Sequence, residues 1–193
     1  MLSFVMKYEQ LDFSAALRTL ANRVGIPLKE DKPRTVVRNP LVGVNEVAMR
    51  YFREALNTDK GSLARDYIQR RGINDKSVEQ FGLGYAPNNG EELKRYATGG
   101  GVREEQLIAA GLLVVGENGE SREFFRGRLI IPIWDAHGML VGFGGRELGS
   151  GNPKYLNTPQ THIFDKGAIL YGLDKARESA GNESGLVIVE GYT

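Results

Sequence analysis

A carboxylate follows the last apolar run of this sequence. Glu190 comes directly after Leu186–Val189, a run of four apolar residues that is typical of a buried strand. Open α/β sheets place ligands and metal ions at the C-terminal ends of such strands. Glu190 is therefore a candidate residue for binding a ligand or a metal ion. A solvated carboxylate at a strand end gives the same pattern, and spacing alone favours that alternative.

Two glycine-containing turns carry arginines. Arg126 and Arg128 flank Gly127 just before an apolar run, and Arg146 ends the glycine-rich turn 142–146. Glycine lets a backbone approach closely, and the guanidinium fork matches phosphate oxygens. The turn lacks the spacing of a dinucleotide-binding loop or a Walker loop. A solvated strand start and a plain β-turn are the structural alternatives, and each is the more common explanation of its pattern.

A third candidate segment follows a Gly-Asn-Pro turn and combines a cation, an aromatic ring and an amide. Lys154 can contact a phosphate, Tyr155 can stack on a base or sugar, and Asn157 can hydrogen-bond to a base edge. Lys166 adds a further cation downstream. The stretch 122–177 contains more Lys and Arg than Asp and Glu, which fits a local contact with phosphate.

Composition limits the class of protein. The chain has 193 residues, of which 41% are hydrophobic and 25% charged, and its net charge is +1. This length suffices for one domain with an apolar core, and the small net charge excludes a globally basic nucleic-acid coat. The absence of cysteine excludes disulfides, zinc–cysteine sites and a thiol nucleophile. No apolar run is as long as a membrane span, so we expect a soluble, cytoplasmic protein with no membrane partner.

The elements that position these residues divide into a helix-rich first half and a strand-rich second half. Apolar spacing predicts helices over 12–25, 47–56, 64–68, 78–81, 91–96, 104–110 and 168–180, and extended segments over 81–87, 112–115, 129–133, 139–143 and 186–189. Turn residues predict two hairpins, one after 112–115 and one between 129–133 and 139–143. The polar stretch 29–44 is interpreted as a linker. The pattern predicts an α+β fold of mixed helices and short strands.

A series of short motifs runs through residues 64–192 of the sequence. The motifs are Ala64–Ile73, Phe81–Pro87, Phe125–Ile133, Val141–Arg146, Pro153–Pro159, Phe164–Gly167, Leu170–Leu173 and Val187–Tyr192. Their order and spacing resemble the catalytic core of bacterial DnaG-type DNA primases over residues 45–193. The resemblance implies that 45–185 form the N-terminal subdomain of that core and that 186–193 begin a Toprim α/β fold. Residues 1–28 resemble the tail of the zinc-binding domain that precedes the core.

The resemblance also implies an activity. The family synthesises short RNA primers on single-stranded DNA from ribonucleoside triphosphates, by metal-dependent nucleotidyl transfer during replication. Mg²⁺ or Mn²⁺ is held by Toprim carboxylates, zinc belongs to the N-terminal domain of the intact protein, and a replicative helicase is the expected partner.

The family's functional positions carry over to particular residues of this chain. Glu190 matches the first Toprim acid, in a catalytic or metal-associated role. The residues that match positions lining the family's nucleotide and template site are Arg146, Lys154, Tyr155, Asn157 and Lys166. Arg126 and Arg128 match the basic residues at the start of a strand in the family.

The sequence departs from the family pattern in three places. Phe124 stands where many members carry arginine, the zinc-binding cysteines are absent, and the later Toprim aspartates lie beyond Thr193. One carboxylate cannot hold two Mg²⁺ ions, so we expect the chain as given to be an inactive fragment of a primase. A non-catalytic module that binds single-stranded DNA is the alternative. Another Toprim enzyme is disfavoured, because the motifs at 153–159 and 170–173 are specific to primases.

Overall fold

The computed structural model describes residues 39–179 and 187–191, together with Val5, Ala16, residues 19–21 and Arg23. The chain forms two compact units, Met1–Val37 and Arg38–Thr193. In the first unit every described residue is helical, in agreement with the helix predicted over 12–25. The rest of that prediction, and most of the predicted linker, lie outside the described residues.

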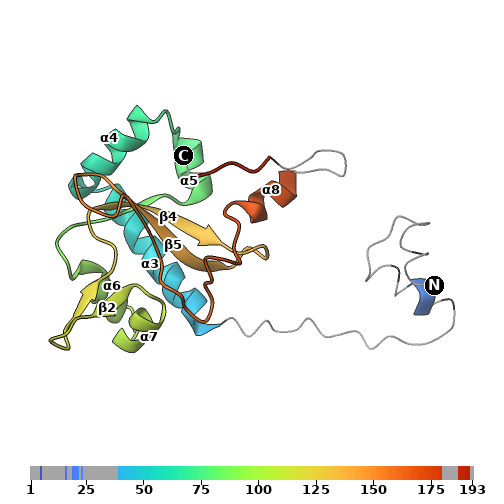
Figure 1. Ribbon diagram of the computed structural model, residues 1–193, viewed down its shortest axis with the longest axis horizontal. Helices are drawn as coiled ribbons and strands as arrows, with labels where there is room; N and C mark the ends of the chain where they lie inside the picture. The colour runs from blue at the N-terminus through green and yellow to red at the C-terminus, as the bar shows by residue number, and fades with distance from the viewer. Residues whose placement is uncertain are drawn as a thin grey trace. The chain divides into compact units, whose positions relative to one another are not determined.

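The second unit begins with the long helix α3. The helices are α3 (Pro40–Leu56), the 3₁₀ turn η1 (Asp59–Gly61), α4 (Ser62–Arg70), α5 (Asp75–Phe81), α6 (Glu92–Gly99), α7 (Glu104–Ala109) and α8 (Leu173–Ser179). The strands are β1 (Gly84–Ala86), β2 (Leu113–Val115), β3 (Ser121–Glu123), β4 (Arg128–Trp134), β5 (Leu140–Glu147) and β6 (Tyr155–Asn157). This arrangement confirms the predicted α+β fold (Figure 1).

The strands form a four-stranded antiparallel sheet in the order β1-β4-β5-β6 and a separate hairpin of β2 and β3. Asp135 closes the central β4–β5 hairpin, because its Oδ1 accepts hydrogen bonds of 2.9 Å from the amides of His137 and Met139. Gly138 takes the left-handed conformation that this turn requires, with φ of 74°. Both hairpins predicted from the turn residues are thereby confirmed.

Helix α3 covers one face of the sheet (Figure 1). Phe52 of α3 packs edge-on against Phe143 of β5, with ring centroids 5.5 Å apart at 81°. The backbone of β1 approaches α3 so closely that a Cβ at Gly84 would lie 2.6 Å from the Cβ of Phe52. Only glycine fits there, and this contact joins the edge of the sheet to the main core.

The opposite face of the sheet is covered by α4 and α5. Leu129 and Ile131 of β4 lie in a second apolar cluster with Ala64 and Ile68 of α4 and with Leu83 before β1. Since alternate residues of a strand point to opposite faces, β4 supplies both cores. This is why nearly all of Arg128–Trp134 is buried.

Two predicted helix boundaries were wrong, and one strand was not predicted. Helix α3 begins at Pro40, inside the predicted linker, because Asn39 Oδ1 caps the amide of Leu41 at 3.0 Å and proline suits the first helical position. The helix predicted over 168–180 begins only at Leu173, since Gly172 has a φ of 75° that no α-helix contains. The strand β6 has no counterpart among the predicted elements.

The strand predicted over 186–189, just before Glu190, is wrong over its described residues. Val187, Ile188 and Val189 form no strand and are 88%, 73% and 75% exposed, whereas Leu186 lies outside the described residues. An apolar segment becomes a buried strand only where a neighbouring strand pairs with it. Among the described residues, neither β1 nor β6 at the sheet edges pairs with this run. No helix in the described part of the chain is long and apolar enough to cross a membrane.

The close approach at Gly84 gives a prediction about stability. Gly84→Ala should lower the free energy of unfolding by about 1–3 kcal/mol, because the new methyl group overlaps Phe52. The matched control is Gly43→Ala on the exposed side of α3, where a Cβ would meet nothing within 4 Å. That substitution should raise stability by about 0.5–1 kcal/mol. Urea denaturation of both variants checks the pair, and equal effects would contradict the packing described here.

Candidate functional site

Arg146 lies between two tyrosine rings at the edge of the sheet. It is directly opposite Tyr155 in the β5–β6 pairing, and its Cζ lies 4.8 Å from the Tyr155 ring centroid and 5.4 Å from that of Tyr67. Its Nε also donates a 3.2 Å hydrogen bond to the Tyr67 hydroxyl. Cation–π contacts of this kind stabilise a guanidinium and hold it in one orientation. The arginine is therefore preorganised, because α4 and β6 fix it from two sides.

One donor of this guanidinium is unused. Nη1 of Arg146 is buried and has no hydrogen-bond partner among the described residues. Leaving a buried donor unpaired costs about 1–3 kcal/mol, and more for a charged group. An acceptor supplied by a ligand, such as a phosphate oxygen, would remove that cost.

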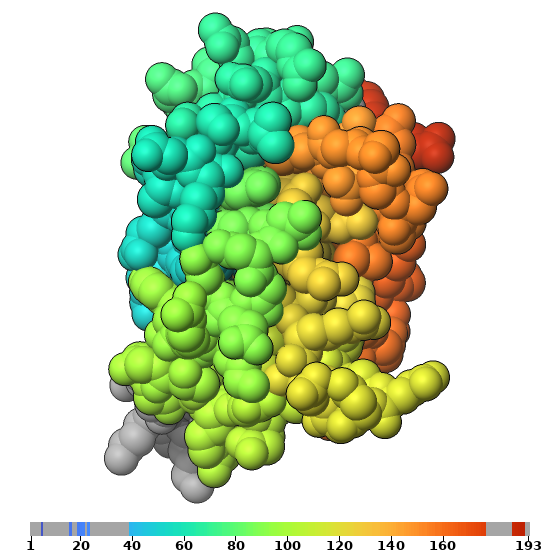
Figure 2. Space-filling model, turned by 90° about the vertical axis from the view of Figure 1, so that its left-hand side faces the viewer, coloured from blue at the N-terminus to red at the C-terminus, as the bar shows by residue number. Residues whose placement is uncertain are grey.

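A polar cavity of about 220 Å³ lies beside Arg146, in the turn between β5 and β6. It is lined by Arg146, Glu147, Gly149, Ser150, Gly151, Asn152 and Lys154. The turn is held by the Glu147 amide, which donates to the Lys154 carbonyl at 3.0 Å, and by the Gly149 amide, which donates to Glu147 Oε1 at 3.0 Å. Helix α4 and this turn lie side by side on the surface, as Figure 2 shows.

Arg128 forms an ion pair with Glu147, the one acidic residue among those that line this cavity. It is only 6% exposed, and its Nη2 lies 3.3 Å from Glu147 Oε2. Its Nη1 donates to the carbonyls of Pro153 at 2.9 Å and Gly145 at 3.4 Å. The positive charge of Arg128 offsets the negative charge of Glu147. The cavity therefore presents the positive charges of Arg146 and Lys154. The structure thus gives Arg128 a structural role, and its predicted contact with phosphate stays a prediction.

Two further predicted residues, Tyr155 and Asn157, lie on strand β6 beside Arg146. Tyr155 is 41% exposed, and Asn157 is half-buried on the same strand, two residues on and opposite Gly144. Tyr155 and Asn157 therefore share one face of β6. The structure thus brings Arg146, Lys154, Tyr155 and Asn157 together at the β5–β6 edge.

Three predicted residues belong to other segments. Arg126 is exposed in the connection from β3 to β4, and Lys166 is exposed in a turn that Asp165 closes by accepting the Gly167 amide at 2.9 Å. Glu190 is exposed in a bend after Val189. In the described part of the chain, no hydrogen bond, ion pair or cation–π contact links these three side chains to Arg146, so their roles in a common site stay predictions.

Sequence reasoning missed Tyr67, which lies in one of the family motifs but was given no function. Its contact with Arg146 joins residues 79 positions apart, and no local pattern indicates such a pairing. Arg71 was missed as well, and its Cζ lies 5.9 Å from the same tyrosine ring. Two arginines followed by glycine at a helix end are a weak signal, because cations are common near helix C-termini.

The described residues do not fit a divalent metal ion. Within residues 39–179 and 187–191 no three side chains of His, Asp or Glu come together in a group that could hold one. Glu190 alone offers a single carboxylate. The metal-associated role of Glu190 therefore stays a prediction.

Comparisons with known proteins show the family to which this chain belongs. A family model described as the DNA primase catalytic core, N-terminal domain, matches residues 51–177. The chain is 48% identical over 190 residues to a DNA primase of Deinococcus radiodurans, covering 98% of this chain and 32% of that protein. It is 32% identical over 197 residues to the DNA primase of Escherichia coli K12, covering 99% of this chain and 34% of that protein. The chain spans about a third of the length of these relatives.

Solved structures give the same result. A DnaG primase catalytic domain bound to single-stranded DNA is 38% identical with a TM-score of 0.69, covering 79% of this chain and 47% of that one. The zinc-binding and RNA polymerase domains of the Aquifex aeolicus primase are 32% identical with a TM-score of 0.66, covering 92% of this chain and 43% of that one. The fold is that of the N-terminal domain of a primase catalytic core. The chain belongs to the family of bacterial DnaG-type DNA primases, as its motifs indicated.

The different roles of Arg128 and Arg126 give a second prediction. Arg128→Leu should lower the free energy of unfolding by about 1–3 kcal/mol, because it leaves the partly buried Glu147 carboxylate without its partner and removes the hydrogen bonds to two backbone carbonyls. Arg126→Leu, two residues earlier at an exposed position, should change it by no more than about 0.5 kcal/mol. Urea denaturation measures both. A small loss for Arg128→Leu would contradict its structural role.

Proposed function

We propose that this chain supplies the basic, template-facing part of a DNA primase, an enzyme that synthesises RNA primers on single-stranded DNA. The observation that carries the proposal is Arg146, held between Tyr67 and Tyr155 beside the exposed Lys154. The kinship with DNA primases and the structural relative bound to single-stranded DNA support it.

Each side chain of the site has a distinct task in this proposal. Arg146 and Lys154 bind phosphate oxygens of the template or of a ribonucleoside triphosphate, and the exposed ring of Tyr155 offers a surface on which a base can stack. Asn157 hydrogen-bonds to a base or sugar. Primer synthesis is a phosphoryl transfer, in which positioned cations offset the charge that develops on the phosphate oxygens.

The other family properties enter as proposals too. We infer nucleotidyl transfer with Mg²⁺ or Mn²⁺ on Toprim carboxylates, in which Glu190 takes part. Glu190 is the one carboxylate among the described residues that matches a Toprim acid. Ribonucleoside triphosphates as substrates, a replicative helicase as partner and work in the bacterial cytoplasm follow from the kinship alone. No observation favours the alternative of a non-catalytic DNA-binding module over the primase.

The electrostatic part of the proposal gives a third prediction. Lys154→Ala should weaken binding of single-stranded oligothymidylate and reduce the slope of log Kobs against log [salt] by about 0.7, the value for one lost phosphate contact. The matched control is Arg95→Ala, which removes an exposed cation from α6. It should leave the slope unchanged. Fluorescence anisotropy over a salt series measures both, and equal slopes for Lys154→Ala and the unaltered chain would overturn the assignment of Lys154.

A further inference from the structure

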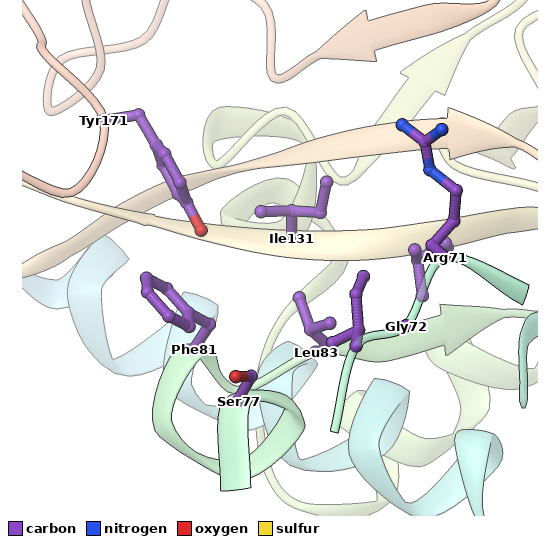
Figure 3. A pocket seen from close by; sticks show the side chains of 9 residues that line it. Arg71, Gly72, Ser77, Phe81, Leu83, Ile131 and Tyr171 are labelled. Carbon is purple, nitrogen blue, oxygen red and sulfur yellow. The ribbon is translucent and has the colours of Figure 1, made fainter. Parts of the chain in front are cut away.

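An apolar cavity of about 380 Å³ lies between the sheet and the connection from α4 to α5. It is lined by Arg71, Gly72, Ile73, Ser77, Phe81, Leu83, Leu129, Ile131 and Tyr171 (Figure 3). The volume falls within the range of cavities that bind small planar ligands. The exposed apolar run Val187–Val189 does not fill it, since each of those residues is at least 73% exposed.

The walls of this cavity suit a flat ring. Phe81 and Tyr171 bound one end with nearly parallel rings, whose centroids are 6.3 Å apart at an interplanar angle of 29°. Figure 3 shows these rings on opposite sides of that end of the cavity, with Ile131 and Leu83 forming the adjacent wall. Aromatic and branched aliphatic side chains give a planar heterocycle both stacking faces and apolar contacts.

The rim of the cavity is joined to the basic site at the β5–β6 edge. Arg71 lines the cavity, and its Cζ lies 5.9 Å from the centroid of the Tyr67 ring. Arg146 contacts the same ring at 5.4 Å. One tyrosine therefore separates a guanidinium at the cavity from the guanidinium of the basic site. A strand whose phosphates passed Arg146 and Arg71 would bring a base to the mouth of the cavity.

We propose that this cavity receives one unstacked base of the single-stranded template, while the adjoining phosphate contacts Arg71. The inference rests on the proposed function and extends it by a base-binding position outside the β5–β6 edge. Because the walls are apolar and aromatic, the cavity accepts a base by stacking and shape, with little preference for sequence. A base bound in the cavity fixes which nucleotide of the DNA template lies beside Arg146.

The test compares two oligonucleotides of equal length, oligothymidylate and an abasic strand that keeps the phosphates but lacks the bases. Ser77 points toward the cavity from α5, so Ser77→Trp fills the space. The variant should bind oligothymidylate about 5- to 100-fold more weakly than the unaltered chain, in line with one lost stacked base. It should bind the abasic strand with unchanged affinity and an unchanged salt slope. The matched control, Gln80→Trp at an exposed position of α5, should bind both strands like the unaltered chain.

Each of the following results would contradict the proposal. Equal affinities of Ser77→Trp and the unaltered chain for oligothymidylate would exclude a base in the cavity, and an equal loss on both strands would show an indirect effect. A ribonucleoside triphosphate that binds the unaltered chain but not Ser77→Trp, with template binding intact, would assign the cavity to the free nucleotide. If the unaltered chain bound neither strand, the proposed function would fail as well. Ser77→Phe fills less space and should show the same selective loss, which guards against misfolding of one variant.

Discussion

The ion pair between the buried Arg128 and the partly buried Glu147 is the interaction on which the site depends. It links the first residue of β4 to the last residue of β5, and Arg128 also holds the carbonyl of Pro153 across the following turn. The pair fixes the turn that carries Lys154 and at the same time compensates the one acid of the cavity. Burying a pair of charges contributes little net stability, but removing one partner is costly. The pair therefore specifies the shape and the charge of the β5–β6 edge more than it adds to the stability of the fold.

The sheet connects this edge to the rest of the domain. Strand β4 supplies one core beneath α3 and another beneath α4, so the two helices are held at fixed positions relative to β5. Helix α4 then presents Tyr67 to Arg146, and the same ring contacts Arg71 at the mouth of the apolar cavity. The arginine that lines the apolar cavity and the arginine of the basic edge thus contact one aromatic side chain. This arrangement suits a flexible strand that carries phosphates on one side and bases on the other.

Much of the fold was predictable from the sequence, because helical spacing and turn residues are local signals. Helices α3, α4, α6 and α7 and both hairpins were found in this way. Strand β6 was missed because three residues acquire strand geometry only by pairing with β5, and the run Val187–Val189 was overpredicted because apolar composition does not supply a neighbouring strand. In the site, Arg146, Lys154 and Tyr155 were identified from residue type and family motif. The structural role of Arg128 and the contact of Tyr67 with Arg146 depend on partners distant in sequence, which no local pattern reveals.

The central claim is that the β5–β6 edge, with Arg146 fixed between two tyrosines, contacts single-stranded nucleic acid. The most direct measurement is a nuclear magnetic resonance titration of the isotope-labelled chain with a short oligothymidylate, in which the Arg146 Nε–Hε signal and the backbone amides of 147–157 are followed. We predict that these signals shift together and saturate at one affinity, and that the shifts shrink as salt is raised. Shifts confined to α6 and α7, or a stationary Arg146 signal under saturating oligonucleotide, would contradict the account.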